Sequence, residues 1–360
     1  MSLSIARKYR PNSFAQVVGQ DITVRILINS IIMNREVNSM LLTGIRGTGK
    51  TTLARIYAKA LNCDNFNGDT CNSCASCIEA DNGSHLDIIE FDAASNNGVD
   101  FIRELGYIVQ QLPSYKRRVL IFDEAHMFSK QAQAALLKIL EEPPVNLTFI
   151  LVTTDPEKLE NTIRSRCLSM PLKAISGKDI EVNLRSVLES EGKEYTNEFL
   201  QTLSLLGGGS LRDVQQILDQ CILASGSGPI DSQYLEDSVG IVSVRQYREL
   251  SPVLNSLNLK RGTEAVERWY NKGYDLQMLF NDGVPNLLRD FMVILSGAYS
   301  EEITLLSGIP AEIIKKKLTL TQDQVRIISK EWEDTLELIS GTHHPKIIWQ
   351  MFLINICKAI

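Results

Sequence analysis

The segment GIRGTGKT at residues 44–51 is the feature that most narrows what this chain can fold into. It fits the pattern G-x-x-x-x-G-K-[ST], and it lies between an apolar segment at 39–43 and a segment of helical periodicity at 51–61. In that context the glycines let backbone N–H groups converge on phosphate oxygens, and the helix N-terminus adds partial positive charge. The segment therefore predicts a strand–loop–helix unit that binds a nucleoside triphosphate, rather than a fortuitous glycine-rich turn.

Four side chains near this loop have the chemistry of phosphoryl transfer. Lys50 is expected to reach the β- and γ-phosphates, and the Thr51 hydroxyl to ligate Mg²⁺. After the apolar segment 118–122, Asp123 would help to hold the magnesium ion and Glu124 would polarise the attacking water. A solvated acidic turn is the alternative for this pair. The other loop residues assigned to nucleotide binding are Gly44, Gly47, Thr48, Gly49 and Thr52.

Residues 123–126 also spell DEAH, the box of one helicase group. That class requires a second motor domain of similar size with its own motifs, and a shared motif alone does not establish function. The remainder of this chain shows a helical pattern without such motifs. The helicase interpretation is therefore disfavoured.

Strand and helix patterns alternate over the first half of the chain. The predicted strands are 39–43, 86–91, 118–122 and 147–153, and the predicted helices are 21–36, 51–61, 100–112 and 130–140. This alternation predicts a parallel sheet with helices on its faces. Beyond about residue 172 the strand pattern fades, and helices broken at 207–209, 225–229, 271–273, 308–310 and 341–345 are predicted instead. We therefore expect an α/β domain at 1–177, a small helical domain at 178–242 and a larger helical domain at 243–360.

Charge is distributed unevenly along the 360 residues. The net charge of −6 disfavours a simple basic nucleic-acid binder, but residues 1–62 contain nine Lys/Arg and two Asp/Glu, whereas residues 63–104 contain one Arg and nine Asp/Glu. A basic face can therefore exist on this acidic protein. No apolar run of about 18 residues is present, and the first eleven residues lack the apolar region of a signal peptide. We expect a cytoplasmic protein with no membrane partner.

Cysteines are concentrated between residues 63 and 77. Cys63, Cys71, Cys74 and Cys77 give the spacing C-x7-C-x2-C-x2-C. Gaps of two residues let thiolates share one tetrahedral ion, so four such ligands favour a closed structural zinc site. An iron–sulfur centre is an alternative, although the Cys-Pro element of ferredoxin-type motifs is missing, and free thiols are another. The isolated Cys167, Cys221 and Cys357 are expected to be small buried apolar residues.

Together these motifs resemble one protein family. RKYRP at 7–11, VVGQ at 17–20, the phosphate loop and the cysteine cluster are followed by DAASNNGV at 92–99, LLKILEEPP at 136–144, TTDP at 153–156 and SRC at 165–167. This order resembles the gamma/tau family of bacterial DNA polymerase III, the ATPases of the sliding-clamp loader. The resemblance covers essentially the whole chain, densely over the first 220 residues and more weakly over the helical end.

The resemblance implies an architecture and a set of partners. An AAA+ domain, a helical lid and an all-α collar match the three predicted units. The family assembles as a pentamer of further copies of itself with the delta and delta-prime subunits, and chi/psi subunits that link it to single-stranded DNA are possible partners. Its substrates are ATP, the sliding clamp and primed DNA. Longer members continue into a region that binds helicase and polymerase, so we expect either the short form or a shortened version of a longer chain.

The resemblance also implies roles for individual residues. Arg10, Pro11, Val17 and Val18 match the adenine pocket. Thr154 matches the sensor of the γ-phosphate, Arg212 matches the lid sensor, and Arg166 matches the arginine finger that each subunit lends to its neighbour's ATP. A solvated arginine is the alternative for Arg166 and Arg212. Ser95, Asn96, Gly98 and Arg103 match the DNA-facing segment, with a capped helix that contacts no DNA as the alternative.

Two other functions are possible for a chain with this predicted fold. A nucleotide-inert scaffold of the delta-prime type has no need of the intact phosphate loop or of Asp123 and Glu124. A different AAA+ machine, such as a branch-migration motor, lacks both the cysteine insertion and Ser165-Arg166-Cys167. The sequence therefore favours an ATP-driven motor that places a clamp on primed DNA. We find no second carboxylate constellation for DNA polymerisation, so a DNA-directed DNA polymerase activity would belong to the holoenzyme and not to this chain.

Overall fold

The computed structural model describes residues 4–144, 146–231, 234–235, 242, 244–299, 305, 307–340 and 344–360. The chain divides into two compact units. The first unit contains Met1–Glu191 and Leu206–Asp219, and the second unit contains Gly192–Leu205 and Gln220–Ile360. Residues 178–242 are thus divided between the two units, and the predicted three-domain division with boundaries at 177 and 242 stays a prediction.

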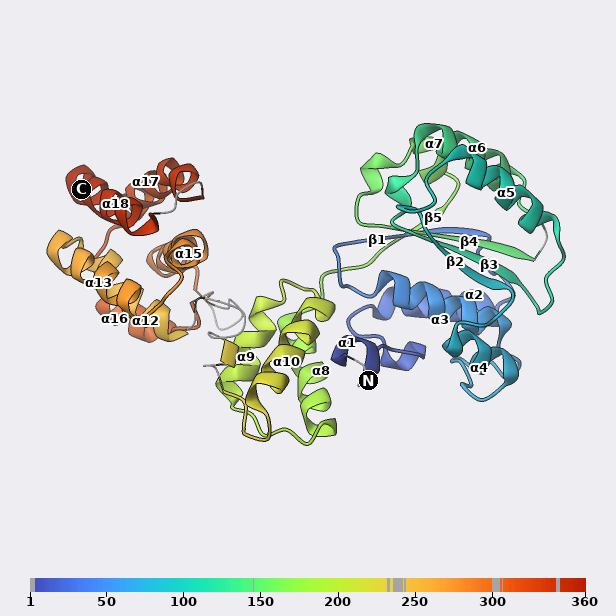
Figure 1. Ribbon diagram of the computed structural model, residues 1–360, viewed down its shortest axis with the longest axis horizontal. Coiled ribbons are helices and arrows are strands. Elements are labelled where there is room, and N and C mark those ends of the chain that lie inside the picture. The colour runs from blue at the N-terminus through green and yellow to red at the C-terminus, as the bar shows by residue number, and fades with distance from the viewer. Residues whose placement is uncertain are drawn as a thin grey trace. The chain divides into compact units, whose positions relative to one another are not determined.

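A five-stranded parallel sheet forms the centre of the first unit, with the strand order β2-β3-β4-β1-β5 (Figure 1). The strands are β1 Ser39–Thr43, β2 Ile88–Asp92, β3 Arg118–Asp123, β4 Leu147–Thr153 and β5 Leu168–Pro171. Residues of β1 and β3 pair in register with residues of the central strand β4. The carboxyl ends of β1, β3 and β4 therefore lie at one edge of the sheet, where ligands bind in open α/β sheets.

The four predicted strands are confirmed, whereas β5 was not among them. The reason is its pattern: only Met170 of its four residues is buried, so it lacks the apolar run that marks a central strand. It pairs with β1 alone among the described strands. Pro171 is compatible with this place because an edge strand does not need every backbone N–H group for its ladder.

Alternating side chains of the central strands pack against helices on opposite faces of the sheet. Leu120 and Phe122 of β3 contribute to the core beneath α5, α6 and α7, whereas Val119 and Ile121 contribute to the core beneath α2 and α3 (Figure 1). These helices are α2 Asp21–Ile32, α3 Lys50–Asn62, α5 Val99–Gln110, α6 Lys130–Glu141 and α7 Asn161–Arg164. Both faces of the sheet are therefore buried, as parallel sheets require.

Short elements complete the first unit and lead into the second. They are α1 Ile5–Lys8, η1 Phe14–Gln16, α4 Ala75–Asn82, η2 Ala125–Met127, η3 Pro156–Lys158, α8 Gly177–Ser190, α9 Asn197–Leu206 and α10 Leu211–Ser225. The helix breaks predicted at 207–209 and 225–229 are confirmed, since the first lies between α9 and α10 and the second follows α10. The break between α8 and α9 was not predicted, and most of residues 230–242 lie outside the described residues. The last of the four clustered cysteines lies on a helix, because α4 begins at Ala75 and contains Cys77.

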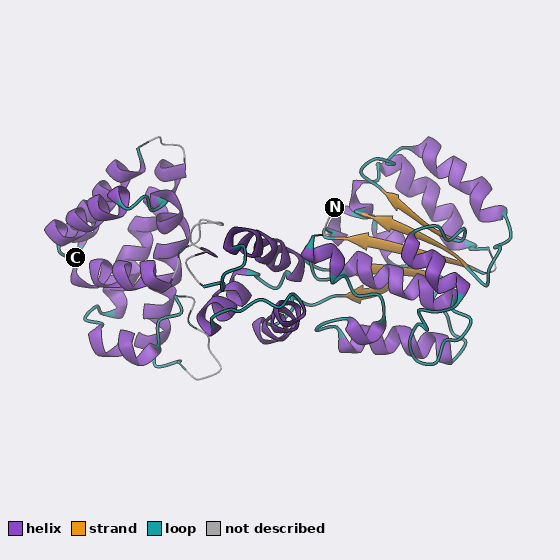
Figure 2. Ribbon diagram, turned by 60° about the horizontal axis from the view of Figure 1, so that its bottom comes forward, coloured by secondary structure: helices purple, strands orange, loops and turns teal. Residues whose placement is uncertain are grey.

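The described part of the second unit is built from helices, as Figure 2 shows. Besides most of α9 and the end of α10, they are α12 Val244–Ser256, α13 Leu259–Asn271, α14 Leu276–Met278, η4 Leu279–Gly283, α15 Val284–Leu295, α16 Ala311–Lys317, α17 Gln322–Ser340 and α18 Pro345–Ala359. Trp269, Phe280, Trp349 and Phe352 form an edge-to-face aromatic cluster at the centre of their core. Helix breaks predicted at 271–273 and 308–310 are confirmed, while residues 341–343 lie outside the described residues. Among the described helices, we find none long and apolar enough to cross a membrane.

Candidate nucleotide site and cysteine cluster

The phosphate loop connects the buried strand β1 to the N-terminus of α3, as predicted. Three of its glycines have positive φ angles: Gly44 at 140°, Gly47 at 80° and Gly49 at 92°. Residues other than glycine rarely adopt these backbone angles. In addition, a Cβ atom on Gly44 would lie 2.6 Å from the carbonyl oxygen of Leu172. Glycine is therefore required for the turn that aims the loop's N–H groups.

The Lys50 ammonium is held inside the loop. Its Nζ atom donates hydrogen bonds of 2.9 Å to the carbonyl oxygens of Gly44 and Ile45. Partial burial lowers the pKa of Lys50, while the nearby carboxylates of Glu124 and Asp123 oppose that shift. The arrangement holds the cation at the loop with only weak carbonyl partners, so a phosphate group would be a stronger partner for it.

The side chains predicted to hold magnesium are close together. Thr51 Oγ1 donates a 3.0 Å hydrogen bond to Asp123 Oδ2, joining the start of α3 to the end of β3. Both are oxygen donors of the kind that Mg²⁺ prefers, and Mg²⁺ uses few protein ligands because it keeps its waters and the substrate phosphates. These two residues therefore fit a magnesium ion at the phosphate end of the site.

Glu124 has an unusual conformation. Its φ angle of 51° places a non-glycine residue in the left-handed region, a strain of the sort found at functional sites. Its Oε2 atom is buried without a hydrogen bond from the described residues, and it lies 3.4 Å from His126 Nδ1. His126 Nδ1 in turn lies 3.0 Å from Thr153 Oγ1 at the end of β4. A carboxylate oxygen in this state is suited to accept a proton from a water molecule.

The predicted nucleotide residues surround one cleft of about 1210 Å³ in the first unit. Those that line it are Arg10, Pro11, Val17, Val18, Gly47, Thr48, Gly49, Lys50, Thr51, Thr52, Asp123, Glu124, Thr154 and Arg212. Gly44 is not among the lining residues, although its carbonyl oxygen accepts a hydrogen bond from Lys50, which is one of them. The structure thus brings together residues from the phosphate loop, the end of β3, the residue that follows β4, α3, α10 and the N-terminal segment.

Further residues that line the cleft were not assigned to nucleotide binding from the sequence. Arg7, Ile45 and Arg46 lie within the recognised motifs, whereas the others lie outside them: Ser4, Ala6, Arg55, Asp81, Ile175, Leu211, Gln215 and Gln216. Arg55 follows Thr51 by one helical turn on α3 and forms a bidentate ion pair with Glu90, with N···O distances of 2.6 and 2.7 Å. Partial burial and the neighbouring Arg55 guanidinium lower the pKa of Arg10. The helical spacing from Thr51 was the one local signal that pointed to Arg55.

The start of α10 lies directly against the phosphate loop. A Cβ atom on Gly47 would lie 1.9 Å from Ser210 Oγ, so only glycine permits this approach. Arg212 is one of the cleft residues, and the Gln215 amide, which is also at the cleft, donates to Asn183 on α8 at 3.1 Å. Arg212 is therefore at the cleft of its own chain, as its predicted role in nucleotide sensing requires.

Arg166 has a different place. It follows α7, and its guanidinium donates to the carbonyl oxygen of Thr162 at 2.9 Å and to Glu141 Oε1 at 2.7 Å. The side chain is 36% exposed and is not a lining residue of the cleft in its own chain. To reach a phosphate of another molecule, this exposed guanidinium would exchange its bond to Glu141 for the phosphate, and its finger role stays a prediction.

The predicted DNA-facing segment is an exposed turn before α5. Asp92 organises it: its Oδ2 atom accepts from Ser95 Oγ at 3.0 Å, and its carbonyl oxygen accepts from the Asn96 amide at 3.0 Å. Gly98 is the N-cap of α5, and Arg103 is exposed on that helix. The Ser95 and Asn96 side chains thus stabilise the turn, and the backbone N–H groups of residues 94–96 also donate to Asp92. The candidates for contacts with phosphates are therefore Arg103 and the first N–H groups of α5.

The four clustered cysteines converge as predicted. All four Sγ atoms lie within 4.8 Å of one another, and a tetrahedral zinc site with Zn–S bonds of about 2.3 Å would separate them by about 3.8 Å. The backbone N–H of Cys71 donates to Cys63 Sγ at 3.4 Å, and that of Cys74 donates to Cys71 Sγ at 3.3 Å. A hydrogen bond from the Ser73 backbone lowers the pKa of Cys71 to about 5. Such N–H donors stabilise thiolates, so the donor set fits zinc.

Comparison with known proteins gives the following similarities. Residues 19–176 match a family model described as "DNA polymerase III, delta subunit". The tau subunit of DNA polymerase III from Salmonella typhimurium is 38% identical over 296 residues, 82% of this chain and 46% of that protein. The Bacillus subtilis tau subunit is 33% identical over 99% of this chain and 63% of its own length. The Holliday junction branch migration motor RuvB of Thermotoga maritima has a TM-score of 0.48 at 17% identity, over 71% of this chain and 81% of that chain.

Coverage is more complete for a shorter relative. The gamma subunit of DNA polymerase III from Buchnera aphidicola subsp. Schizaphis graminum is 34% identical over 98% of this chain and 84% of its own. By contrast, the chain spans about half the length of the Salmonella relative. The phosphate loop after β1, the parallel sheet and the helical second unit agree with the predicted AAA+ P-loop fold. On this sequence identity and fold, the chain belongs to the gamma/tau family of DNA polymerase III subunits.

Proposed function

We propose that this chain is an ATPase subunit of the DNA polymerase III clamp loader, which uses ATP binding and hydrolysis to load the sliding clamp on primed DNA. The observation that carries the proposal is the intact phosphoryl-transfer site: Lys50 sits in the phosphate loop, and Thr51 and Asp123 are joined beside it. Membership of the gamma/tau family supports it. We propose the cytoplasm as the place where the chain works, in keeping with its part in DNA replication.

Each residue of the site has one task in the proposed reaction. The loop's N–H groups and Lys50 bind the β- and γ-phosphates, and Thr51 and Asp123 hold Mg²⁺, which when bound neutralises developing charge on the phosphates. Glu124 accepts the proton of the attacking water, for which its Oε2 atom, which accepts no hydrogen bond from the described residues, is suited. Thr154 contacts the γ-phosphate and that water, while Arg10, Pro11, Val17 and Val18 enclose the adenine.

Hydrolysis in this proposal requires assembly. Arg166 lies outside the cleft of its own chain, and its guanidinium completes the site of a neighbouring subunit by stabilising charge that spreads over the γ-phosphate. Heterologous contacts of this kind build a curved or spiral oligomer. The proposed neighbours are further copies of this chain together with the delta and delta-prime subunits, with chi/psi subunits as possible additional partners.

Clamp loading then follows from coupling between the sites. ATP at the interfaces favours a spiral that grips an open clamp, and DNA inside the spiral aligns the arginine fingers and triggers hydrolysis. Hydrolysis weakens clamp binding and DNA binding together, which requires that both bind the ATP state more tightly than the ADP state. The lid sensor Arg212, at the cleft and on α10, would transmit the nucleotide state.

A nucleotide-inert scaffold is the second candidate, because the family model that matches residues 19–176 is described as a delta subunit. An inert subunit does not need a lysine in the phosphate loop, nor an acidic pair at the end of β3. Lys50, Asp123 and Glu124 all line the cleft here. The site chemistry therefore favours the ATPase.

The test is ATP turnover by the chain reconstituted with delta and delta-prime, with and without clamp plus primed DNA. We expect strong stimulation only when clamp and DNA are both present, and a Lys50→Ala complex should serve as the blank. Unchanged turnover on adding clamp and DNA would contradict clamp loading and favour a different AAA+ machine. Absence of turnover with normal assembly would favour the scaffold.

The DNA-facing segment has its own test. Arg103→Ala should reduce the affinity of the ATP-bound complex for primed DNA and lower the slope of log affinity against log salt concentration by about one, because one phosphate contact is lost. Lys130→Ala, on the neighbouring helix α6, is a basic surface control. DNA affinity and salt slope that are unchanged in Arg103→Ala would exclude the phosphate contact.

A further inference from the structure

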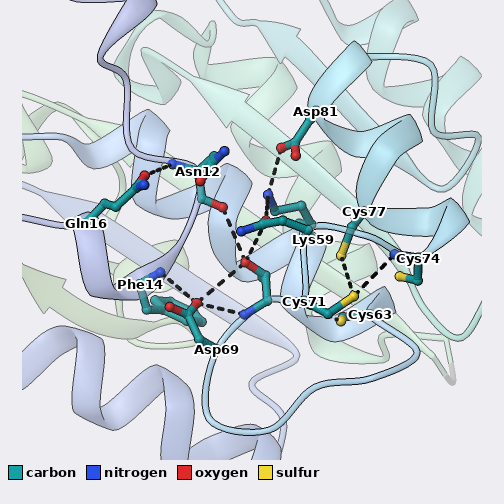
Figure 3. A network of polar contacts seen from close by, with 12 residues as sticks. Asn12, Phe14, Gln16, Lys59, Cys63, Asp69, Cys71, Cys74, Cys77 and Asp81 are labelled. Carbon is teal, nitrogen blue, oxygen red and sulfur yellow. Dashed lines mark hydrogen bonds and ion pairs between the residues drawn. The ribbon is translucent and has the colours of Figure 1, made fainter. Parts of the chain in front are cut away.

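The side chain of Asp69, in the cysteine loop, caps a helix that begins 55 residues earlier in the chain. Its two carboxylate oxygens accept hydrogen bonds from the backbone N–H groups of Phe14 at 2.8 Å and Ala15 at 3.0 Å (Figure 3). These residues begin the short helix η1, whose own N-cap, Ser13, makes no side-chain capping bond. Asp69 therefore supplies the charge-assisted capping that the local sequence lacks.

The loop that carries Asp69 is fixed at both ends. Cys63 directly follows α3, and Cys71 follows Asp69 by two residues, so the cysteine cluster closes the loop on either side of Asp69. The buried Lys59 of α3 donates 2.7 Å hydrogen bonds to Asn72 Oδ1 in this loop and to Asp81 Oδ1 on α4. Figure 3 shows Asp69, Lys59 and the cysteines as parts of one polar network.

The capped segment is also part of the nucleotide cleft. Arg10 and Pro11 precede η1, Val17 and Val18 follow it, and all four line the cleft. Phe14 is 2% exposed and packs in the same core as α3. The two N–H groups bound by Asp69 therefore lie between the two pairs of residues assigned to the adenine pocket.

From this geometry we infer that Asp69 is a positioning residue for the nucleotide base. The cysteine loop, closed by its metal, holds Asp69 against η1, and this contact fixes the segment that carries Val17 and Val18. The inference rests on the proposed function, since it takes the ligand to be an adenine nucleotide. It gives the cysteine cluster a task beyond stabilising its own loop: base affinity depends on it, whereas phosphate affinity does not.

The experiment compares Asp69→Asn with Asp64→Asn in the complete chain. Asp64 lies in the same loop, is exposed, and pairs with Lys116 at 3.5 Å rather than with the N-terminal segment. With Mg²⁺ present, binding of ATP and of inorganic tripolyphosphate is measured by calorimetry. For Asp69→Asn we expect about tenfold weaker ATP binding, the scale of one lost charged hydrogen bond, with unchanged tripolyphosphate binding. Asp64→Asn should match the wild type for both ligands.

Two further readouts separate positioning from damage to the fold. Bound zinc, measured by atomic emission, should be retained in Asp69→Asn. Amide hydrogen exchange in residues 13–18 should become faster, while exchange in β1 should stay slow. Equal losses of ATP and tripolyphosphate affinity, or unchanged ATP affinity and exchange, would overturn the inference. A wild-type chain that bound neither ligand would instead contradict the proposed function and remove the basis of the inference with it.

Metal removal tests the link from the cysteines to Asp69. A zinc-selective chelator, with Mg²⁺ maintained, should weaken ATP binding to the wild type selectively and speed exchange in residues 13–18. In Asp69→Asn the same treatment should add little, because the contact that transmits the effect is already lost. Additive losses in the variant would show that the cluster acts on the nucleotide by another route, and the inference would fail.

Discussion

At the residue scale, the stability of the first unit depends on the buried ion pair between Asp87 and Arg118. Asp87 is fully buried, and Arg118 Nη2 lies 2.9 Å from its Oδ1 atom. The guanidinium also donates to the carbonyl oxygens of Ile108 and Gln111, and the Tyr115 backbone N–H donates to Asp87 Oδ2 at 2.6 Å. The pair is satisfied on every side, so either charge left alone would be costly.

We predict that Asp87→Ala destabilises the first unit by about 3–5 kcal/mol, because the Arg118 charge stays buried without its partner. Glu181→Ala, which breaks the half-buried surface pair with Arg185 on α8, should cost no more than about 1 kcal/mol. Urea unfolding followed by circular dichroism gives the comparison.

The tryptophans provide an internal control for that prediction. Trp269, Trp332 and Trp349 all lie in the second unit, so their fluorescence reports that unit. Asp87→Ala should leave the urea midpoint of the fluorescence transition near that of the wild type. A small effect of Asp87→Ala on circular dichroism would show that the site relaxes or admits water, contrary to the burial argument.

At the element scale, the glycines before α10 determine how the start of that helix meets the rest of the first unit. Gly208 and Gly209 both have left-handed φ angles, 50° and 88°. A Cβ atom on Gly209 would lie 2.6 Å from the Cβ atom of Ala174, whereas one on Gly208 would meet no atom within 4 Å. The two substitutions therefore share the backbone strain and differ in the steric overlap.

Gly209→Ala should move the start of α10 and weaken binding of an ATP analogue by about tenfold, because Arg212 and Gln215 are carried on that helix into the cleft. Gly208→Ala should change nucleotide affinity much less, since it adds only the strain of its backbone angle. Titration with a fluorescent ATP analogue provides the measurement. Equal affinities for the two variants would mean that α10 contributes little to the bound state.

At the scale of the whole molecule, the site is proposed to be complete only in an assembly. Arg166→Ala should leave ATP binding near normal and remove most hydrolysis by the reconstituted complex, because the finger acts on a neighbour's γ-phosphate. Arg164→Ala is a matched control two residues away, whose guanidinium pairs with Glu157 at 2.9 Å. Single-turnover hydrolysis separates chemistry from binding. Normal hydrolysis by an assembled Arg166→Ala complex would disprove the finger.

The sequence by itself determined those features whose physical cause is local. The strands 39–43 and 147–153 have the predicted bounds, because buried strands carry continuous apolar runs. The phosphate loop was predicted from its own residues, since its glycines and Lys50 form the turn and bind phosphate within one short segment. The cysteine cluster was found in the same way, because its spacing reflects the reach of one metal ion.

Only the tertiary structure decided what segments distant in sequence do to one another. No periodic pattern in the sequence indicates such contacts. Examples are the capping of η1 by Asp69, the closeness of Ser210 to Gly47 and the position of Asp81 at the cleft. The sequence did not predict the edge strand β5 for a related reason. Its backbone is extended because it pairs with β1, and only one of its four residues is buried. Local periodicity in the sequence shows which face of a helix or strand is buried. A contact between residues 55 positions apart depends instead on how the whole chain packs. The free energy of that packing is shared among many weak interactions.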